Sequence, residues 1–380
     1  MTADGRRVLM TADTVGGVWQ YALELSRVLA AGGDDIVLAT FGGMPTPAQQ
    51  HEAAAIRGLT LLPSDLKLAW MCAPWDDVAR GADWLATLAD QVRPDVVHLN
   101  DFSHGDLAWG APVLTVAHSC VLSWWQAVHD TAAPDTWGRY AAHVRASLRA
   151  ADLVVAPTQA MLDATCAHYG PLPHTRVIHN GRSLPAPAPG PGVDETPMVL
   201  AAGRVWDAAK NLRALAAVAP RLSWPVCIAG ADRSPDGDRI ELPNVRLLGQ
   251  LSSDDLAPWF ARAPIYALPA RYEPFGLTAL EAALSGCALV LGDIDSLREV
   301  WGDAAMFVPP DDEDALAAAL QALIDDPALR ARQAALARAR AARYTPGVMA
   351  DGYRAAYSEL VQAHAARATA PPLVAAAGGA

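Results

Sequence analysis

Short apolar runs alternate with longer stretches of helical periodicity along most of the chain. The run RRVLMTAD at residues 6–13 is typical of a buried strand, and GGVWQYALELSRVLAAGG at residues 16–33 has apolar positions at helical spacing and ends on a glycine pair. Further strand-like runs follow, with helical stretches such as DVARGADWLATLADQV between them: DIVLATF, DVVHLN, VLTVAHS and LVVAPT. This alternation predicts parallel strand–helix–strand units whose sheet is covered on both faces.

The same alternation restarts after a stretch rich in proline and glycine. This stretch, RSLPAPAPGPGVDETP at residues 182–197, is typical of an extended and fairly stiff linker. The strand-like runs that follow it are MVLAAGRV, VCIAG, VRLLGQ, IYALPA, ALVLGD and AAMFV. We therefore predict an α/β fold with two doubly wound domains, at residues 1–181 and 198–346. Ligands of such sheets bind at the carboxyl ends of the strands, so two facing sheets can hold a large substrate.

The C-terminal segment has the composition of three helices interrupted at Pro327 and Pro346. The last helix is expected at about residues 347–364. Residues 365–380, AARATAPPLVAAAGGA, are predicted to be disordered.

Composition and charge narrow the class of protein. Of the 380 residues, 52% are apolar and 18% are charged, which is a globular composition. The formal net charge of −12 argues against nucleic acid as a partner and against strong adhesion to anionic lipid. The five cysteines form no C-x-x-C pair, which favours reduced thiols in the cytoplasm. The apolar stretch after the two N-terminal arginines is too short for a signal peptide, and no run approaches the ~18 apolar residues of a transmembrane helix. Any membrane contact is therefore expected to be peripheral.

The stretch ARYEPFGLTALEAALSGC at residues 270–287 contains two glutamates that stand eight positions apart. A helix is expected to begin near Phe275–Leu277, and its free N–H groups and dipole suit a diphosphate. Gly276 has no side chain to block close approach. Glu273 can face a neutral polyol, and Glu281 can accept hydrogen bonds from vicinal hydroxyls such as those of a ribose. Ordinary glutamates of a surface helix are the alternative, and the Pro-Phe-Gly context argues against it.

Two further segments end predicted strands with residues suited to phosphate. LAAGRVWDAAKNL at residues 200–212 has Arg204 and Lys210 as its only cations, in a loop that leads into a helix. Solvated surface cations are the alternative. Gly16 and Gly17 open the first helix and allow close backbone approach to a ligand, although a bare glycine turn would have the same sequence. The spacing is not G-x-G-x-x-G, so the nicotinamide fingerprint is absent.

His118 lies at the end of the run VLTVAHS, where cleft residues belong, although a lone histidine is more often structural. No cluster of histidines and carboxylates supports a metal site, and we predict none. Eight of the twelve tryptophans precede the linker, including the pair Trp124 and Trp125. Tryptophan faces stack on sugar rings, so this pair is a candidate for binding a glycosyl acceptor, whereas core packing is expected to account for most of the eight.

Together these segments resemble family 4 of the retaining glycosyltransferases, which have the GT-B fold, over roughly residues 8–360. The motifs that carry the resemblance stand in the family's order: the Gly16-Gly17 pair, HNG at 179–181, AGR…KN at Arg204 and Lys210, NVRLLGQLSSDDL at 244–256, and the E-x7-E pattern at Glu273 and Glu281. The resemblance implies two Rossmann-like domains that face a central cleft, with the last helix returning to the first domain.

The resemblance also implies roles for individual residues. Arg204 and Lys210 would hold the donor diphosphate, and Glu281 would bind the ribose. Glu273 and the backbone of Phe275, Gly276 and Leu277 would hold the donor sugar and phosphate. Gly16 and Gly17 would approach the phosphate or the acceptor, His118 would approach the transferred sugar, and Leu248 and Gly249 would line the base pocket. The catalytic candidates are His118, Glu273, Arg204 and Lys210.

This sequence departs from the family pattern after His118. Many relatives have a carboxylate there, whereas Ser119 and Cys120 follow here, so no role for that neighbour carries over.

The function that we expect is transfer of a hexosyl unit from a nucleotide sugar to a glycan, glycolipid or small-molecule hydroxyl. UDP-glucose is the default donor, and no cofactor is expected. A nucleotide-sugar epimerase or hydrolase on the same fold is the first alternative, and a non-catalytic binding protein is the second. Release of nucleotide diphosphate only in the presence of an acceptor would separate a transferase from the first alternative.

The reaction is expected to keep the anomeric configuration and to need no divalent metal. The Asp-x-Asp spelling at Asp293 to Asp295 is poorly placed for the phosphates. An inverting route needs a general base on the first domain. Asp13 and Asp101 are the carboxylates that remain open for that role.

Overall fold

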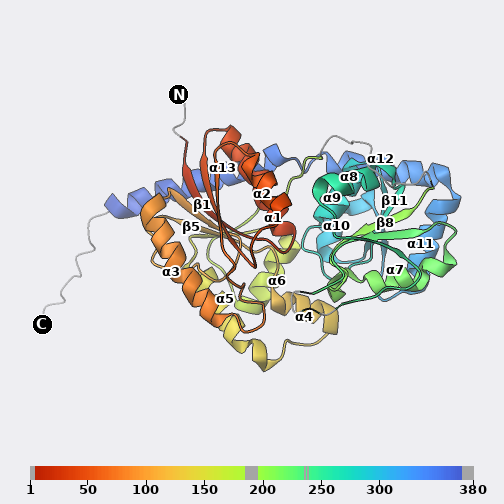
Figure 1. Ribbon diagram of the computed structural model, residues 1–380, viewed down its shortest axis with the longest axis horizontal. Coiled ribbons are helices and arrows are strands. Elements are labelled where there is room, and N and C mark those ends of the chain that lie inside the picture. Colours follow the sequence, from red (N-terminus) through yellow and green to blue (C-terminus); the bar gives the residue numbers. More distant parts are fainter. Residues whose placement is uncertain (1–4, 185–195, 235–236, 238, 370–380) are drawn as a thin grey trace, which may run out of the picture.

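The computed structural model describes residues 5–184, 196–234, 237 and 239–369. Within these residues the strands form two separate parallel sheets, each flanked by helices, and the two layered halves lie side by side (Figure 1). The α/β architecture with two doubly wound sheets is therefore as the sequence predicted.

The first sheet has the strand order β3-β2-β1-β4-β5-β6-β7, and neighbouring strands are parallel. Its strands are β1 (Arg7–Asp13), β2 (Asp35–Phe41), β3 (Leu59–Pro63), β4 (Val96–Leu99), β5 (Val113–Val116), β6 (Leu153–Ala156) and β7 (Thr175–Val177). The helices that connect them are α1 (Gly17–Ala31), α2 (Pro47–Ala54), α3 (Trp75–Val92), α4 (Val121–His129), α5 (Gly138–Ala150) and α6 (Gln159–Tyr169).

Alternate residues of these strands pack on opposite faces of the sheet. In β1, Val8 and Met10 point into a core shared with α1, whereas Leu9 packs with apolar residues of α3. Because the inner strands β2, β1, β4, β5 and β6 are buried on both faces, they are largely apolar, which is why these runs were recognisable in the sequence.

The second sheet has the order β10-β9-β8-β11-β12-β13 and is also parallel. Its strands are β8 (Val199–Ala202), β9 (Val226–Ala229), β10 (Arg246–Gly249), β11 (Ile265–Leu268), β12 (Ala288–Gly292) and β13 (Met306–Val308). Helices α7 (Leu212–Val218) and α11 (Glu313–Asp325) cover one face, and α8 (Ser253–Arg262), α9 (Leu277–Leu284), α10 (Asp295–Trp301) and α12 (Pro327–Ala341) cover the other.

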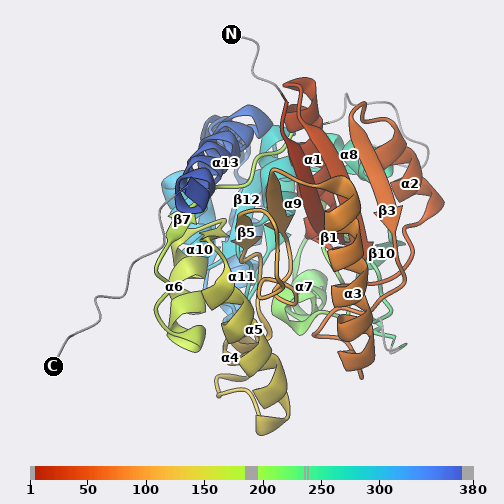
Figure 2. The same ribbon diagram turned by 90° about the vertical axis from the view of Figure 1, so that its left-hand side faces the viewer.

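The last helix, α13 (Pro346–Thr369), belongs in space to the first sheet. It follows α12 in the chain but lies along the first half of the molecule (Figures 1 and 2). Tyr353 and Tyr357 are fully buried in the core that contains Val8 and Met10. The chain thus crosses between the two halves twice.

Two boundaries differ from the sequence prediction. Residues 365–369 are helical rather than disordered, and Arg367 makes an ion pair with Asp152 at 2.7 Å; the alanine-rich segment continues the helix because alanine favours it. Residues 370–380 lie outside the described residues. The predicted linker begins with Arg182, which is buried, and Ser183, which is exposed, and both are bonded to Glu24 of α1. Residues 185–195 also lie outside the described part.

The strand orders define where ligands are expected. Each order reverses direction at one point, between β1 and β4 in the first sheet and between β8 and β11 in the second. Doubly wound sheets bind ligands beside the carboxyl ends of such strands. The loops that follow β1, β4, β8 and β11 are therefore the first place to look for a site.

Candidate functional site

Loops from the carboxyl ends of both sheets meet at the turn that opens α1. A Cβ atom placed on Gly16 would lie 3.2 Å from Nη1 of Arg204, and one on Gly17 would lie 3.5 Å from Cδ1 of Leu277. Leu277 also packs against the hydrophobic cores of both halves. The structure thus brings the glycine turn, Arg204 and the start of α9 together across the two domains.

Asp13 organises the glycine turn. Its Oδ1 accepts hydrogen bonds from the N–H groups of Val15 at 3.0 Å and Gly16 at 2.9 Å. Burial raises the pKa of Asp13, and these amide donors and Arg204 offset part of that rise. Asp101, after β4, instead accepts from Ser103 N–H and from Thr11, and its pKa is lowered although its burial acts in the opposite direction.

Each of the two predicted cations is held by a carboxylate. Arg204 Nη2 lies 2.6 Å from Oδ2 of Asp207, and Lys210 Nζ lies 2.6 Å from Oε2 of Glu273. Burial would raise the pKa of Asp207, but Arg204 and Lys210 outweigh it and lower that pKa. The alternative of freely solvated cations is wrong, because the Lys210 side chain is only 16% exposed and both cations are fixed.

Asp207 was not singled out in the sequence, although it lies within the same LAAGRVWDAAKNL segment. Its position between Arg204 and Lys210 was the available signal. Two cations and two carboxylates make this group neutral, so the cations are oriented before any anionic ligand arrives.

The start of α9 differs from expectation in one respect. Oε1 of Glu273 accepts from the N–H groups of Gly276 at 3.0 Å and Phe275 at 3.5 Å, which were expected to be open to phosphate. A carboxylate just before a helix is attracted to its N-terminal amides. Gly276 has φ of +89°, and a Cβ there would also lie 3.2 Å from Leu297, so this turn requires glycine.

Glu281 lies one turn into α9 and pairs with Arg182, whose Nε is 2.5 Å from Oε1 of Glu281. Nη1 of the same arginine is 2.9 Å from Oε2 of Glu24 on α1. The Arg182, Glu24 and Glu281 side chains are 7%, 2% and 12% exposed, respectively. Sequence reasoning missed this bridge because Arg182 stands at the start of a linker-like stretch and its partners are about 100 and 160 residues away.

His118 lies in the loop after β5. Its Nε2 is 2.8 Å from Oδ1 of Asn100, and its ring packs edge-on against Tyr21 with the ring centroids 4.5 Å apart. Burial lowers the pKa of His118 to about 3, and the nearby His98 adds to this, so the ring is neutral at physiological pH. Asn100, which follows β4 directly, carried no local motif.

The two candidate tryptophans lie on α4. Trp124 Nε1 donates to Oδ1 of Asp207 at 2.9 Å, and the Trp125 ring packs on His129 with centroids 4.3 Å apart. The other six tryptophans before the linker pack in or against hydrophobic clusters of the described residues, as expected for most of them: Trp19, Trp70, Trp75, Trp84, Trp109 and Trp137. Trp124 therefore joins the first domain to the loop that carries Arg204.

Leu248 and Gly249 end β10, at the outer edge of the second sheet. Leu248 packs partly against the core, and the carbonyl of Gly249 accepts from Gly230 N–H at 2.8 Å. They lie at the same carboxyl edge as Arg204, two strands away.

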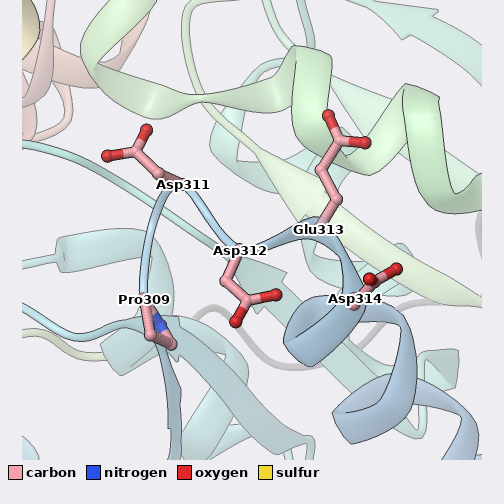
Figure 3. A pocket seen from close by; sticks show the side chains of 5 residues that line it. All are labelled: Pro309, Asp311, Asp312, Glu313 and Asp314. Carbon is pink, nitrogen blue, oxygen red and sulfur yellow. The ribbon is translucent and has the colours of Figure 1, made fainter.

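A hollow in the loop before α11 is lined by Pro309 and four acidic residues (Figure 3). The four are Asp311, Asp312, Glu313 and Asp314. Their carboxylates spread in different directions, and they would repel a phosphate-bearing ligand. The candidate site is therefore the interdomain group around Arg204, not this hollow.

Comparison with known protein families identifies the family to which this chain belongs. Residues 15–184 match the model of Glycosyltransferase Family 4, and residues 196–326 match that of Glycosyl transferases group 1. The two matches cover all the strands of both sheets except β1. This chain belongs to glycosyltransferase family 4.

Two proteins with similar sequences are named as enzymes that transfer sugar units. This glycosyltransferase is 29% identical over 371 residues to the glycogen synthase of Mycobacterium tuberculosis, with 86% of each chain covered. It is 33% identical over 186 residues to a phosphatidyl-myo-inositol mannosyltransferase of Mycolicibacterium smegmatis, covering 43% of this chain and 46% of that one. The epimerase or hydrolase alternative finds no support among these relatives.

Solved structures agree on the fold of the glycosyltransferase. Sucrose-phosphate synthase from Thermosynechococcus elongatus superposes with a TM-score of 0.76 at 19% identity, over 94% of this chain and all of that one. Anabaena Alr3699/HepE, solved in complex with UDP and glucose, has a TM-score of 0.71 at 16% identity, over 93% of this chain and all of that one. The GT-B fold expected from the sequence is confirmed. Among the described residues, none of the helices is both long and apolar enough to span a membrane.

Proposed function

We propose that this glycosyltransferase moves a hexosyl unit from a nucleotide sugar, UDP-glucose by default, to a hydroxyl acceptor with retention of configuration. The observation that carries the proposal is the group formed by Arg204, Lys210 and the start of α9. Two fixed cations lie at the carboxyl edge of the second sheet, beside the start of α9, whose first amides are capped by Glu273. Such an arrangement suits a leaving diphosphate.

In this proposal the donor lies along that edge of the sheet. The diphosphate is bound by Arg204 and Lys210, the ribose by Glu281, and the base beside Leu248 and Gly249. Glu273 then has two tasks, because it orients Lys210 and faces the hydroxyls of the sugar. The backbone of Phe275, Gly276 and Leu277 lies beside the same groups.

The remaining residues of the proposal belong to the first domain. Gly16 and Gly17 allow the phosphates to approach the opening of α1, and His118 contacts the transferred sugar. Trp125 is proposed to contact the acceptor. For Trp124, the bond to Asp207 adds a second role, which is to hold the Arg204 loop.

The chemical step breaks the bond between the sugar C1 and the phosphate oxygen. The acceptor oxygen bonds to C1 on the same face, and its proton moves to the departing phosphate oxygen. The developing negative charge is stabilised by Arg204 and Lys210, so no protein nucleophile is required. Asp13 and Asp101 are the two carboxylates considered as a general base. Asp101 accepts a hydrogen bond from Ser103 N–H of its own loop and its pKa is lowered, so Asp13 is the residue to test.

We further propose that no divalent metal is needed. In the Asp-x-Asp spelling at residues 293–295, Asp293 is paired with Arg298 at 2.7 Å and its pKa is lowered by that hydrogen bond. Asp293 follows β12, the strand after α9, and its carboxylate is already paired with Arg298. A cytoplasmic location, with at most peripheral membrane contact, fits the proposed use of a nucleotide sugar.

Proton NMR of the first product tests the mechanism. UDP-glucose is incubated with the enzyme, EDTA and a panel of acceptors that includes a glucan and an inositol phosphate, which the relatives' names suggest. The expected product is α-linked, and the Asp13→Asn variant is expected to give the same anomer. A β-linked product, or turnover only after Mg²⁺ or Mn²⁺ is restored, would refute the mechanism.

A thermal-shift screen over UDP-, GDP- and ADP-sugars identifies the donor. A ligand at about 100 times its dissociation constant adds roughly 2.7 kcal/mol to the folded state. The largest shift is expected for a UDP-sugar; a larger shift with a GDP- or ADP-sugar would replace UDP-glucose as the donor.

A further inference from the structure

A chain of hydrogen bonds runs from the last helix to His118. On α13, the hydroxyl of Tyr357 lies 2.5 Å from Nδ1 of His98. Nε2 of His98 lies 3.2 Å from Oδ1 of Asn100, and Nε2 of His118 lies 2.8 Å from the same oxygen. Tyr357 and His98 are fully buried and Asn100 is nearly so, whereas the ring of His118 is partly exposed. The chain therefore connects α13 with the proposed sugar-binding loop.

The contacts of Asn100 with Thr11 fix which way its amide points. Nδ2 of Asn100 donates to the carbonyl oxygen of Thr11 at 2.7 Å, and the Asn100 backbone N–H donates to Oγ1 of Thr11 at 2.9 Å. A carbonyl oxygen can only accept, so the amide nitrogen must face Thr11. The amide oxygen must then face both imidazole rings.

The orientation of Asn100 decides the tautomer of both histidines. Because the amide oxygen can only accept, each ring must donate from Nε2. Burial lowers the pKa of His98, like that of His118, to about 3, so each ring carries a single proton. In His98 the unprotonated Nδ1 accepts the hydrogen bond from Tyr357, and the oxygen of Tyr21, 3.3 Å from Nε2, can share that proton.

The same assignment leaves a lone pair on Nδ1 of His118. In the described part of the chain, no hydrogen bond to this atom is found, and His118 is partly exposed. An unprotonated ring nitrogen accepts a hydrogen bond and cannot donate one.

We propose that Tyr357, His98 and Asn100 fix His118 as the Nε2–H tautomer, so that its Nδ1 accepts a hydrogen bond from a hydroxyl of the transferred sugar. The inference rests on the proposed function for the identity of that ligand. Tyr357, His98 and Asn100 are positioning residues, because they act through His118 and not on the sugar itself.

Long-range ¹H–¹⁵N NMR of the full chain labelled on histidine tests the tautomer directly. The His98→Gln and His118→Gln variants assign the two signals. At pH 7.5 both rings are expected to be protonated at Nε2. Protonation of His118 at Nδ1 in the unaltered protein would overturn the proposal.

Kinetics with variants test the positioning role. Asn100→Ala is expected to give His118 a mixture of tautomers and to lower kcat with UDP-glucose by about tenfold, the value of one hydrogen bond, while the Kd of UDP changes less than about twofold. Tyr357→Phe is expected to act in the same direction through His98. Tyr353→Phe is the matched control, because this ring packs on His98 with centroids 5.1 Å apart but its hydroxyl is not part of the chain.

The possible outcomes are distinguishable. An unchanged His118 signal and unchanged kcat in Asn100→Ala would contradict the proposal, as would equal effects of Tyr353→Phe and Tyr357→Phe. If Asn100→Ala does not fold, the tyrosine pair decides. If neither UDP binding nor turnover of any UDP-sugar is detected in the unaltered protein, the proposed function fails, and the NMR tautomer still decides the inference.

Discussion

The largely buried ion pair between Lys210 and Glu273 contributes more to the arrangement of the site than to the stability of the fold. The pair with Glu273 must offset the cost of removing both charges from water, so its net contribution to folding is small. It does fix the ammonium group before a ligand arrives, and charge that is oriented in advance needs no reorganisation during the reaction. The same holds for Arg204 and Asp207.

The first prediction follows from this preorganisation. Lys210→Ala and Arg204→Ala are each expected to lower kcat by about 10²-fold or more, because in the proposed mechanism each removes one charge contact to the leaving diphosphate. Arg213→Ala, at an exposed position of α7, is the control and should keep full turnover. Near-normal turnover of Lys210→Ala or Arg204→Ala at saturating donor would remove these residues from the site.

The lowered pKa of His98 predicts how the stability of the fold depends on pH. The pKa of His98 is about 3 in the folded protein and near 6.5 when unfolded, because burial disfavours the charged ring. Above pH 6.5 the ring is neutral in both states, so its full contribution to stability is present. As the pH falls from 6.5 toward 3, only the unfolded chain takes up this proton, and stability drops by up to about 1.4 kcal/mol per pH unit.

The comparison with His98→Gln isolates that contribution from those of other groups. Urea unfolding between pH 7.5 and 4.5 is expected to show a shallower loss of stability in the variant than in the unaltered chain. Parallel curves for the two proteins would mean that His98 titrates alike in both states.

Single residues could be predicted from the sequence only where a local pattern carried them. Two short segments whose residue types are typical of a phosphate-binding turn contain Arg204, Lys210, Glu273 and Glu281. Asn100 acts through an amide that only its fold neighbours orient, so no local pattern could have revealed it.

At the scale of elements, α4 reaches the loop that carries Arg204, as does the turn that opens α1. Its Trp124 donates from Nε1 to Asp207, which in turn holds Arg204. Trp125, the next residue, makes no such bond and packs on His129. Two adjacent tryptophans of one helix therefore have different surroundings.

The two are expected to respond differently to the same substitution. Trp124→Phe keeps the ring but loses the donor, and it should weaken UDP binding or turnover by about threefold to tenfold. Trp125→Phe, or more strongly Trp125→Ala, should raise the acceptor KM with little effect on the donor. Each Kd and KM can be measured separately, and identical profiles for both variants would contradict this division.

Most elements followed from periodicity, because strands buried on both faces and amphipathic helices leave distinct patterns. The interruptions at Pro327 and Pro346 were equally clear, since proline cannot continue a helix interior. The end of α13 was not, because an alanine-rich segment is compatible with a helix or a disordered tail, and its pairing with Asp152 is decided by the fold.

At the scale of the whole molecule, Arg182 joins the two halves. It bridges Glu24 of the first domain and Glu281 of the second, and all three side chains are largely buried. Removing one partner of such a group leaves a buried charge uncompensated, whereas replacing all of them can be nearly neutral.

Arg182→Ala is therefore expected to lower the free energy of unfolding by about 3–5 kcal/mol. The triple variant Arg182→Met, Glu24→Gln, Glu281→Gln should recover much of that loss, because no buried charge is left unpaired. Urea unfolding at pH 7.5 measures both. An Arg182→Ala protein as stable as the unaltered chain, or a triple variant less stable than Arg182→Ala, would be inconsistent with a buried triad.

The return of α13 to the first sheet has a consequence for biosynthesis. Met349, Tyr353 and Tyr357 complete the core around β1, yet they leave the ribosome after all the strands of both sheets. A nascent chain that already contains the whole first sheet still exposes one apolar side of α1 to the cytosol. Packing of the first-domain core is therefore complete only after the C-terminal half has been translated. We expect a chaperone that binds this apolar surface to assist folding during synthesis.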